Sequence, residues 1–159
     1  MEKNVTLFAI GPVCTTYEIE IGKNKFGEPI KIRYWQVNGP TKAEWYYMCH
    51  GLTFSGGGPF SFSPYSGTSV KKILDVFYKD ISAKDAQAGD IVVFKNAAGS
   101  PIHTCVIITP MFKQNGDLDP DNTMVKSKNG PENPEVVTTL KAVIAVPAYA
   151  GRWRVYTRK

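Results

Sequence analysis

Residues 88–108 read Ala88-Gly89-Asp90-Ile91-Val92-Val93-Phe94-Lys95, Asn96-Ala97-Ala98-Gly99-Ser100-Pro101 and Ile102-His103-Thr104-Cys105-Val106-Ile107-Ile108. Two apolar runs rich in β-branched residues flank a turn of Gly, Asn and Pro, a pattern that predicts a β-hairpin. Alternate side chains of a strand share a face, so we expect His103 to lie on the same face as Cys105 and Ile107. A strand holds a side chain rigidly, which suits a catalytic base.

A cysteine that could pair with this base lies about fifty residues earlier, in Tyr47-Met48-Cys49-His50-Gly51-Leu52-Thr53-Phe54. We expect a short helix to begin at Cys49, where backbone N–H groups carry partial positive charge and favour thiolate over thiol. Catalytic Cys/His pairs are adjacent in space rather than in sequence. The sequence therefore predicts Cys49 as a nucleophile and His103 as its base.

The other cysteines and the second histidine have simpler interpretations. Free cysteine is commonly buried as a small hydrophobic residue, and we assign that role to Cys14 and Cys105. His50 is the rival base, but side chains at successive helix positions diverge, so it cannot easily contact the Cys49 thiol. We expect His50 to be structural or to form a wall of the cleft.

Three sequence elements occur in an order that resembles the NlpC-type cysteine peptidases of the papain-like superfamily. They are Cys49-His50-Gly51-Leu52, Gly89-Asp90-Ile91-Val92-Val93-Phe94 and His103-Thr104-Cys105-Val106-Ile107, and the similar region covers roughly residues 35–130. In that family a Cys-x-Gly-Leu-like element opens a helix, a Gly-Asp strand follows, and a His strand supplies the base. The sequence departs from the commonest pattern at His50, where the family has a small hydroxyl residue.

The resemblance implies a third polar residue that orients His103, on the strand after the histidine hairpin. We assign this role to Ser127, with Lys126 and Asn129 as the candidates if the register slips by one residue. The alternative for Ser127 is an ordinary strand hydroxyl. Backbone N–H groups around Cys49 would stabilise the oxyanion of an amide substrate.

The remaining segments supply strands and an amphipathic helix. Residues 16–21 and 30–37 alternate with period two around a turn, which predicts an antiparallel hairpin. A helix capped at Ser66 follows, with apolar residues at three- and four-residue spacing. The hairpin around His103 and the strands at 124–128 and 152–157 would supply the antiparallel sheet. We expect one α+β, papain-like or NlpC-like domain over residues 1–159, with a small antiparallel sheet or half-barrel and helices packed on one side.

Metal, calcium and phosphate sites are disfavoured by spacing, and no cofactor is expected. Zinc-type ligands occur at Cys49, His50, His103 and Cys105, but without the clips of two Cys or two His that structural zinc uses. The loop at 117–122 has alternating carboxylates but lacks the glycine and glutamate of a calcium loop, so we expect a solvated turn. Ser55-Gly56-Gly57-Gly58 lacks a following Gly-Lys and is interpreted as a flexible lip of the cleft.

Composition fits a single soluble enzyme-sized domain. The chain has 159 residues, 43% of them hydrophobic, which is enough for a core, and its apolar runs fall short of a membrane span. We expect neither membrane nor nucleic-acid binding and no signal peptide. The net charge of +5 favours anionic polymers, including bacterial wall material. An odd count of three cysteines leaves at least one free thiol, as a thiol enzyme needs.

By resemblance, the expected function is hydrolysis of an amide bond in peptidoglycan stem peptides, between a D-acidic residue and a diamino acid. A monomeric antibacterial toxin, or a piece of a secreted protein acting in the periplasm or a target cell, would fit, with an immunity or inhibitor protein as candidate partner. One alternative is an acyltransferase or protein deamidase that uses the same thioester. The other is a non-catalytic binding module with an aromatic surface of Trp45, Tyr46, Tyr47, Phe54, Phe60, Phe62 and Tyr65.

Overall fold

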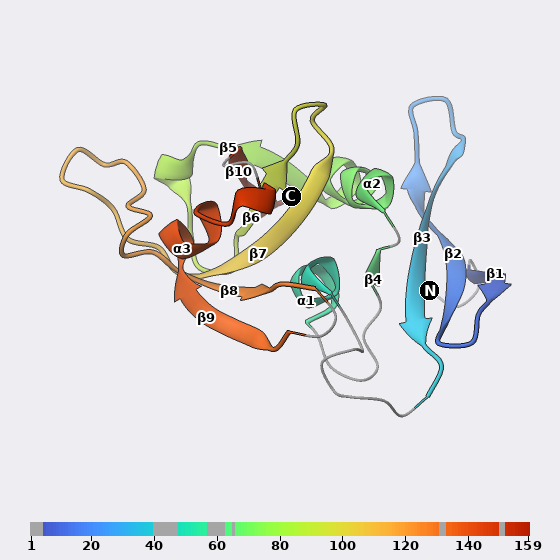
Figure 1. The fold of residues 1–159 in the computed structure, drawn as a ribbon. Coiled ribbons are helices and arrows are strands. Elements are labelled where there is room, and N and C mark those ends of the chain that lie inside the picture. The colour runs from blue at the N-terminus through green and yellow to red at the C-terminus, as the bar shows by residue number, and fades with distance from the viewer. Residues whose placement is uncertain (1–4, 40–47, 57–62, 65, 131–132, 150–151) are drawn as a thin grey trace.

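The computed structural model describes residues 5–39, 48–56, 63–64, 66–130, 133–149 and 152–159. Within these residues the chain forms two antiparallel sheets and three α-helices, so the expected α+β class is confirmed (Figure 1). None of the helices described has the combination of length and hydropathy that a membrane span requires.

The first sheet is built around the predicted N-terminal hairpin. The hairpin strands pair in antiparallel register, with Tyr17 opposite Tyr34 and their rings stacked at a centroid distance of 5.4 Å. The sheet has the order β1-β2-β3-β4, formed by β1 (Val5–Ile10), β2 (Cys14–Lys23), β3 (Pro29–Val37) and β4 (Ser63–Pro64).

The second sheet contains the predicted histidine hairpin at its centre. In the register of this hairpin Phe94 lies opposite His103, and the two predicted strands near 124–128 and 152–157 are also present. The order is β5-β10-β6-β7-β8-β9, formed by β5 (Tyr78–Ile81), β10 (Trp153–Arg158), β6 (Ile91–Lys95), β7 (Pro101–Thr109), β8 (Met124–Lys128) and β9 (Glu135–Thr139).

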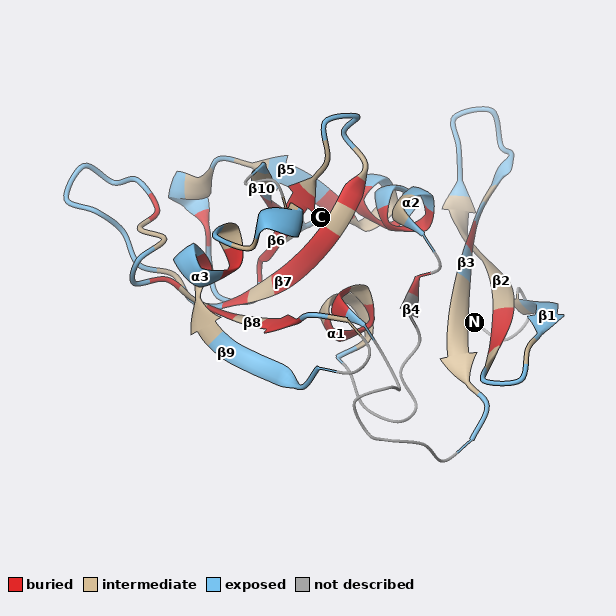
Figure 2. Cartoon of the chain, in the orientation of Figure 1, coloured by how far each residue is buried: buried red, intermediate tan, exposed pale blue. Residues whose placement is uncertain are grey.

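The helices cover both faces of the second sheet, so the expectation of helices on one side was wrong. On one face α2 (Gly67–Phe77) packs Val70 and Ile73 against Ile91 and Val93. On the other face α3 (Leu140–Ile144) packs Leu140 and Val143 against Val92 and Phe94. The reason is the continuous apolar run of β6, whose side chains are buried on both faces and need cover on both (Figure 2).

The helix α2 also joins the two sheets. Ser66 caps it as predicted, by accepting a hydrogen bond from the Ser69 N–H, and Ile32 of β3 belongs to the core cluster that α2 forms with the second sheet. The start of the helix lies against the β6–β7 hairpin, where a Cβ at Gly67 would be 2.9 Å from the Pro101 carbonyl oxygen. Only glycine permits this approach, which fixes α2 beside the strand that carries His103.

Candidate active site

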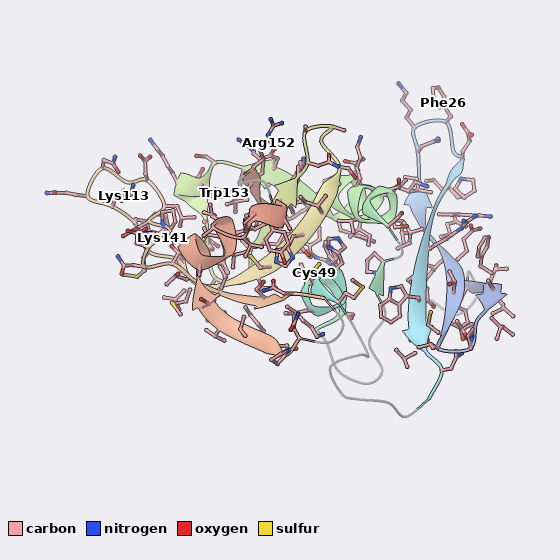
Figure 3. The ribbon with its side chains drawn as sticks, in the orientation of Figure 1. Phe26, Cys49, Lys113, Lys141, Arg152 and Trp153 are labelled. Atoms are coloured by element: carbon pink, nitrogen blue, oxygen red, sulfur yellow. The ribbon has the colours of Figure 1, made fainter. Side chains whose placement is uncertain are left out.

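Cys49 is the first residue of α1 (Cys49–Ser55), which packs against β7 and β8 (Figure 3). A helix of this length is not stable alone, so tertiary packing holds it, mainly through the buried Leu52. It ends at Gly56, whose left-handed backbone, with φ of +80°, lets its N–H bond the Leu52 carbonyl. Cys49 is only 8% exposed.

The Cys49 thiol is surrounded by backbone N–H groups, yet it is not a stabilised thiolate. Burial raises the pKa of the thiol, although the N–H groups of Thr104, His50 and Cys49 and the positive charge of Lys128 act in the opposite direction. The sequence led us to expect that the helix start favours the thiolate. The N–H groups are present as expected, but desolvation outweighs them, so the resting group is a neutral thiol.

Ser127 hydrogen-bonds His103, as the sequence analysis predicted. The Nε2 atom of His103 lies 2.9 Å from Ser127 Oγ, and both side chains are buried. Lys126, one position earlier on β8, points to the other face of the sheet because strand side chains alternate. Asn129 instead accepts a hydrogen bond from the Tyr149 hydroxyl at 2.6 Å. Of the three candidates, Ser127 is therefore the one in contact with His103, and its catalytic role stays a prediction.

Two aromatic rings enclose the His103 imidazole. Tyr149, in the 3₁₀ turn η4 (Pro147–Tyr149), stacks on it with a centroid distance of 3.9 Å and an interplanar angle of 13°. Phe94 of β6 lies 5.7 Å away by the same measure. Sequence reasoning missed Tyr149, because no periodic pattern connects this turn to the histidine strand.

His103 is uncharged at neutral pH in this enclosure. Burial, with a smaller effect from the nearby His50, lowers the pKa of His103 to about 3. Burial also lowers the pKa of His50 to about 4. Both histidines are therefore neutral imidazoles over the pH range in which most enzymes work.

His50 fixes α1 to β7, which agrees with the structural role expected for it. Its Nδ1 lies 2.9 Å from Thr104 Oγ1, and the Thr104 hydroxyl is within 3.5 Å of the Cys49 carbonyl oxygen, to which it can donate. The pairing of β7 with β8 stops at Val106, two residues after Thr104. The backbone N–H of Thr104 can therefore face the Cys49 thiol. Sequence reasoning did not identify this role of Thr104.

The Cys49 thiol also influences groups on the His103 side of the sheet. Burial, followed by the nearby Cys49 and Cys105 thiols, raises the pKa of Tyr149 to about 12. Burial and then Cys49 raise the pKa of Cys105, which is fully buried and suits the inert role assigned to it. Within the described part of the chain no hydrogen bond joins the Cys49 thiol to His103, and His103 Nδ1 makes none.

Lys128 is a buried cation close to the candidate nucleophile. Its side chain is 0% exposed, and Nζ donates to the Gly130 carbonyl oxygen at 2.7 Å. It lies on β8 directly after Ser127, so the same short strand provides the partner of His103 and a positive charge near Cys49. The sequence analysis named the strand but not Lys128.

Several other segments singled out in the sequence have no part in this arrangement. Gly57 and Gly58 of the expected lip lie outside the described residues, as do six of the seven aromatics, Trp45, Tyr46, Tyr47, Phe60, Phe62 and Tyr65. Phe54 is described, and it packs edge-on against Tyr78. In the acidic loop Asp117, Asp121 and Asn122 are exposed and Leu118 is buried, and Asp119 accepts hydrogen bonds from the Asp121 backbone N–H and the Asn122 side-chain amide. In the ranges that the structure describes, no group of three or more potential metal ligands gathers.

Comparisons with other proteins found nothing similar: no family model, curated protein or solved structure matches the chain. The functional interpretation therefore depends on the geometry around Cys49 and His103 and on the order of the sequence motifs.

Proposed function

We propose that the protein is a cysteine hydrolase of the NlpC type, in which Cys49 attacks an amide carbonyl, His103 is the base and Ser127 orients His103. The observation that carries this proposal is the hydrogen bond between His103 Nε2 and Ser127 Oγ. Thr104, the residue that follows His103 on β7, turns its backbone N–H to the Cys49 thiol. Two segments distant in sequence, α1 and β8, thus converge on one short stretch of β7.

In the proposed mechanism Nδ1 of His103 is the nitrogen that acts as the base. With its proton on Nε2 and donated to Ser127 Oγ, the imidazole keeps an unprotonated Nδ1 for the thiol proton. The sulfur bonds to the carbonyl carbon as this proton moves to Nδ1, and the proton then passes to the departing amine. Water hydrolyses the resulting thioester, which frees the acid and restores the thiol.

Cys49 and His103 become charged only during the reaction. The resting pair is a neutral thiol and a neutral imidazole, because burial disfavours both charged forms. As the proton moves and the sulfur attacks, the imidazole becomes an imidazolium while negative charge develops on the sulfur and the carbonyl oxygen, and the attraction between these charges in a buried site offsets part of the desolvation cost. The N–H groups at the start of α1 and the Lys128 cation are positioned to stabilise the negative charge.

The proposed substrate is the peptide stem of bacterial cell wall, cut between a D-acidic residue and a diamino acid. The support is the motif order that resembles the NlpC-type peptidases, together with the net charge of +5, which attracts anionic wall polymers. A delivered toxin or a piece of a secreted protein, with an immunity protein as partner, would fit this substrate.

Digestion of purified wall sacculi tests the proposal. Wild type, Cys49→Ala and the control Cys14→Ala are incubated with sacculi, and released fragments are identified by mass spectrometry. We expect new amine-terminated fragments from wild type and from Cys14→Ala but none from Cys49→Ala. Fragments from Cys49→Ala at the wild-type level would refute the nucleophile. If wild type releases none, yet transfers a trapped acyl group to an added amine or lipid, the acyltransferase alternative replaces hydrolysis.

A further inference from the structure

A cavity lies between the first sheet, α2 and the end of β10. Its volume is about 280 Å³, close to the lower limit of the roughly 300–1,000 Å³ typical of small-molecule sites. Its walls are mainly aliphatic and aromatic side chains, including Ile19 and Ile21 from β2, Ile32 from β3, and Ile73 and Phe77 from α2. Neither Cys49 nor His103 lines it, so it is separate from the candidate active site.

The charged residue of this cavity is Arg158, near the end of β10. Arg158 pairs across the sheet with Tyr78, and its guanidinium carbon lies 5.3 Å from the ring centroids of both Phe77 and Tyr78. These two rings hold the cation at the wall of the cavity. Arg33 and Arg154 form ion pairs with Glu18 and Asp80, whereas no carboxylate in the described part of the chain pairs with Arg158.

We propose that this cavity binds a medium-chain fatty carboxylate, with its alkyl chain among the isoleucines and its carboxylate at Arg158. An alkyl chain matches the apolar walls, because burying it removes apolar surface from water at both partners. A carboxylate matches Arg158, whose guanidinium presents paired donors to a planar anion, whereas an apolar amine would be repelled. The limited volume favours a single chain over a two-chain lipid.

The site has one structural connection to the candidate active site. Phe54, which lines the cavity, lies on α1, the same helix that begins with Cys49. The fatty-carboxylate site nevertheless needs none of the proposed catalytic chemistry. Binding should therefore persist in Cys49→Ala, so the two proposals can fail independently.

Calorimetric titration of the whole chain with decanoate, below its micelle concentration, tests the inference. We expect one decanoate per chain, with affinity reduced at least roughly tenfold, or about 1.4 kcal/mol, in Arg158→Gln. Decanol, which lacks the carboxylate, should bind more weakly than decanoate by a similar factor. Arg152→Gln, which removes an exposed arginine that does not line the cavity, is the matched control and should bind as wild type.

A cavity-filling variant locates the bound chain. Ile21→Trp adds a large ring to the cavity wall and should abolish binding while thermal unfolding remains cooperative. If it does not fold, Arg158→Gln still decides the matter, because Arg158 is exposed and its replacement should leave the fold intact. The inference is overturned if decanoate does not bind wild type, if Arg158→Gln binds it unchanged, or if decanol binds as well as decanoate.

Discussion

Tyr149 lies parallel to His103, with ring centroids 3.9 Å apart, and its hydroxyl donates to Asn129 Oδ1 at 2.6 Å. The imidazole is therefore held from two directions: Ser127 binds its Nε2, and Tyr149 covers one face. Supporting contacts of this kind restrict the rotamers of a catalytic side chain. The same stack excludes water and contributes to the low pKa of His103 through burial.

Replacing Tyr149 separates its ring from its hydroxyl. Tyr149→Phe keeps the stack and loses the bond to Asn129, so we expect a small loss of kcat. Tyr149→Ala removes the stack, worth about 0.5–1.5 kcal/mol, and opens His103 to water, so its pKa should rise toward the ordinary value. An NMR titration of the His103 C2 proton measures this. An unchanged pKa in Tyr149→Ala would show that the ring does not desolvate His103.

Removing the Ser127 hydroxyl leaves a buried imidazole nitrogen without its hydrogen-bond partner. For Ser127→Ala we expect a loss of about 1–3 kcal/mol in the free energy of unfolding. We also expect a fall in kcat of about tenfold or more, equivalent to at least ~1.4 kcal/mol of barrier, with little change in KM. Lys126→Ala, on the opposite face of the same strand, is the control. Equal kcat values for Ser127→Ala and wild type would leave Ser127 as an ordinary strand hydroxyl.

His103 is buried in its neutral form, so the free energy of unfolding depends on pH. The folded state keeps His103 unprotonated down to about pH 3, whereas the unfolded chain protonates it near its ordinary pKa of 6.5. The unfolded state thus binds more protons below pH 6.5, and stability falls as the pH drops. His50, with a pKa of about 4, acts in the same direction.

Urea unfolding at pH 7 and pH 5 measures this effect. From pH 7 to pH 5 the free energy of unfolding of wild type should fall by ~2 kcal/mol more than that of His103→Gln, because the variant lacks one buried histidine. Parallel losses in the two proteins would contradict the assignment of His103 as a buried neutral group.

Lys128 should tune the reactivity of Cys49. Lys128→Met keeps a long apolar side chain but removes the positive charge, so the pKa of the Cys49 thiol should rise further. The alkylation rate of Cys49 at pH 8 should fall several-fold. Lys126→Met, on the same strand and the same face, controls for a general change of charge and should leave the rate unchanged. Equal rates in both variants would remove Lys128 from the electrostatics of the site.

Local patterns made the central part of the fold predictable. The β6–β7 hairpin follows from two apolar runs around a turn, and the contact of Ser127 with His103 follows the predicted placement on the next strand. The two-sided cover of the sheet was also encoded, because the uninterrupted apolar run Ile91–Phe94 has no solvent face. That signal was available, but the prediction assigned helices to one side only.

Tertiary contacts made the rest unpredictable. Tyr149 reaches His103 from a short 3₁₀ turn near the end of the chain, and nothing periodic in the sequence connects the two. The direction of the Cys49 pKa depends on how deeply α1 is buried, whereas the sequence indicates only the helix start. The arrangement of His50 against Thr104 likewise depends on packing between α1 and β7.

The measurement that tests the central claim most directly is the alkylation rate of Cys49 in wild type and in His103→Gln. Iodoacetamide is added at pH 7, and peptide mapping follows Cys49 alongside Cys14, a partly exposed thiol that serves as internal reference. If His103 is the base, the ratio of the Cys49 rate to the Cys14 rate should fall about tenfold or more in His103→Gln, because a general base typically accelerates a reaction by at least this factor. An unchanged ratio, in a variant that still unfolds cooperatively, would contradict the pairing of Cys49 with His103.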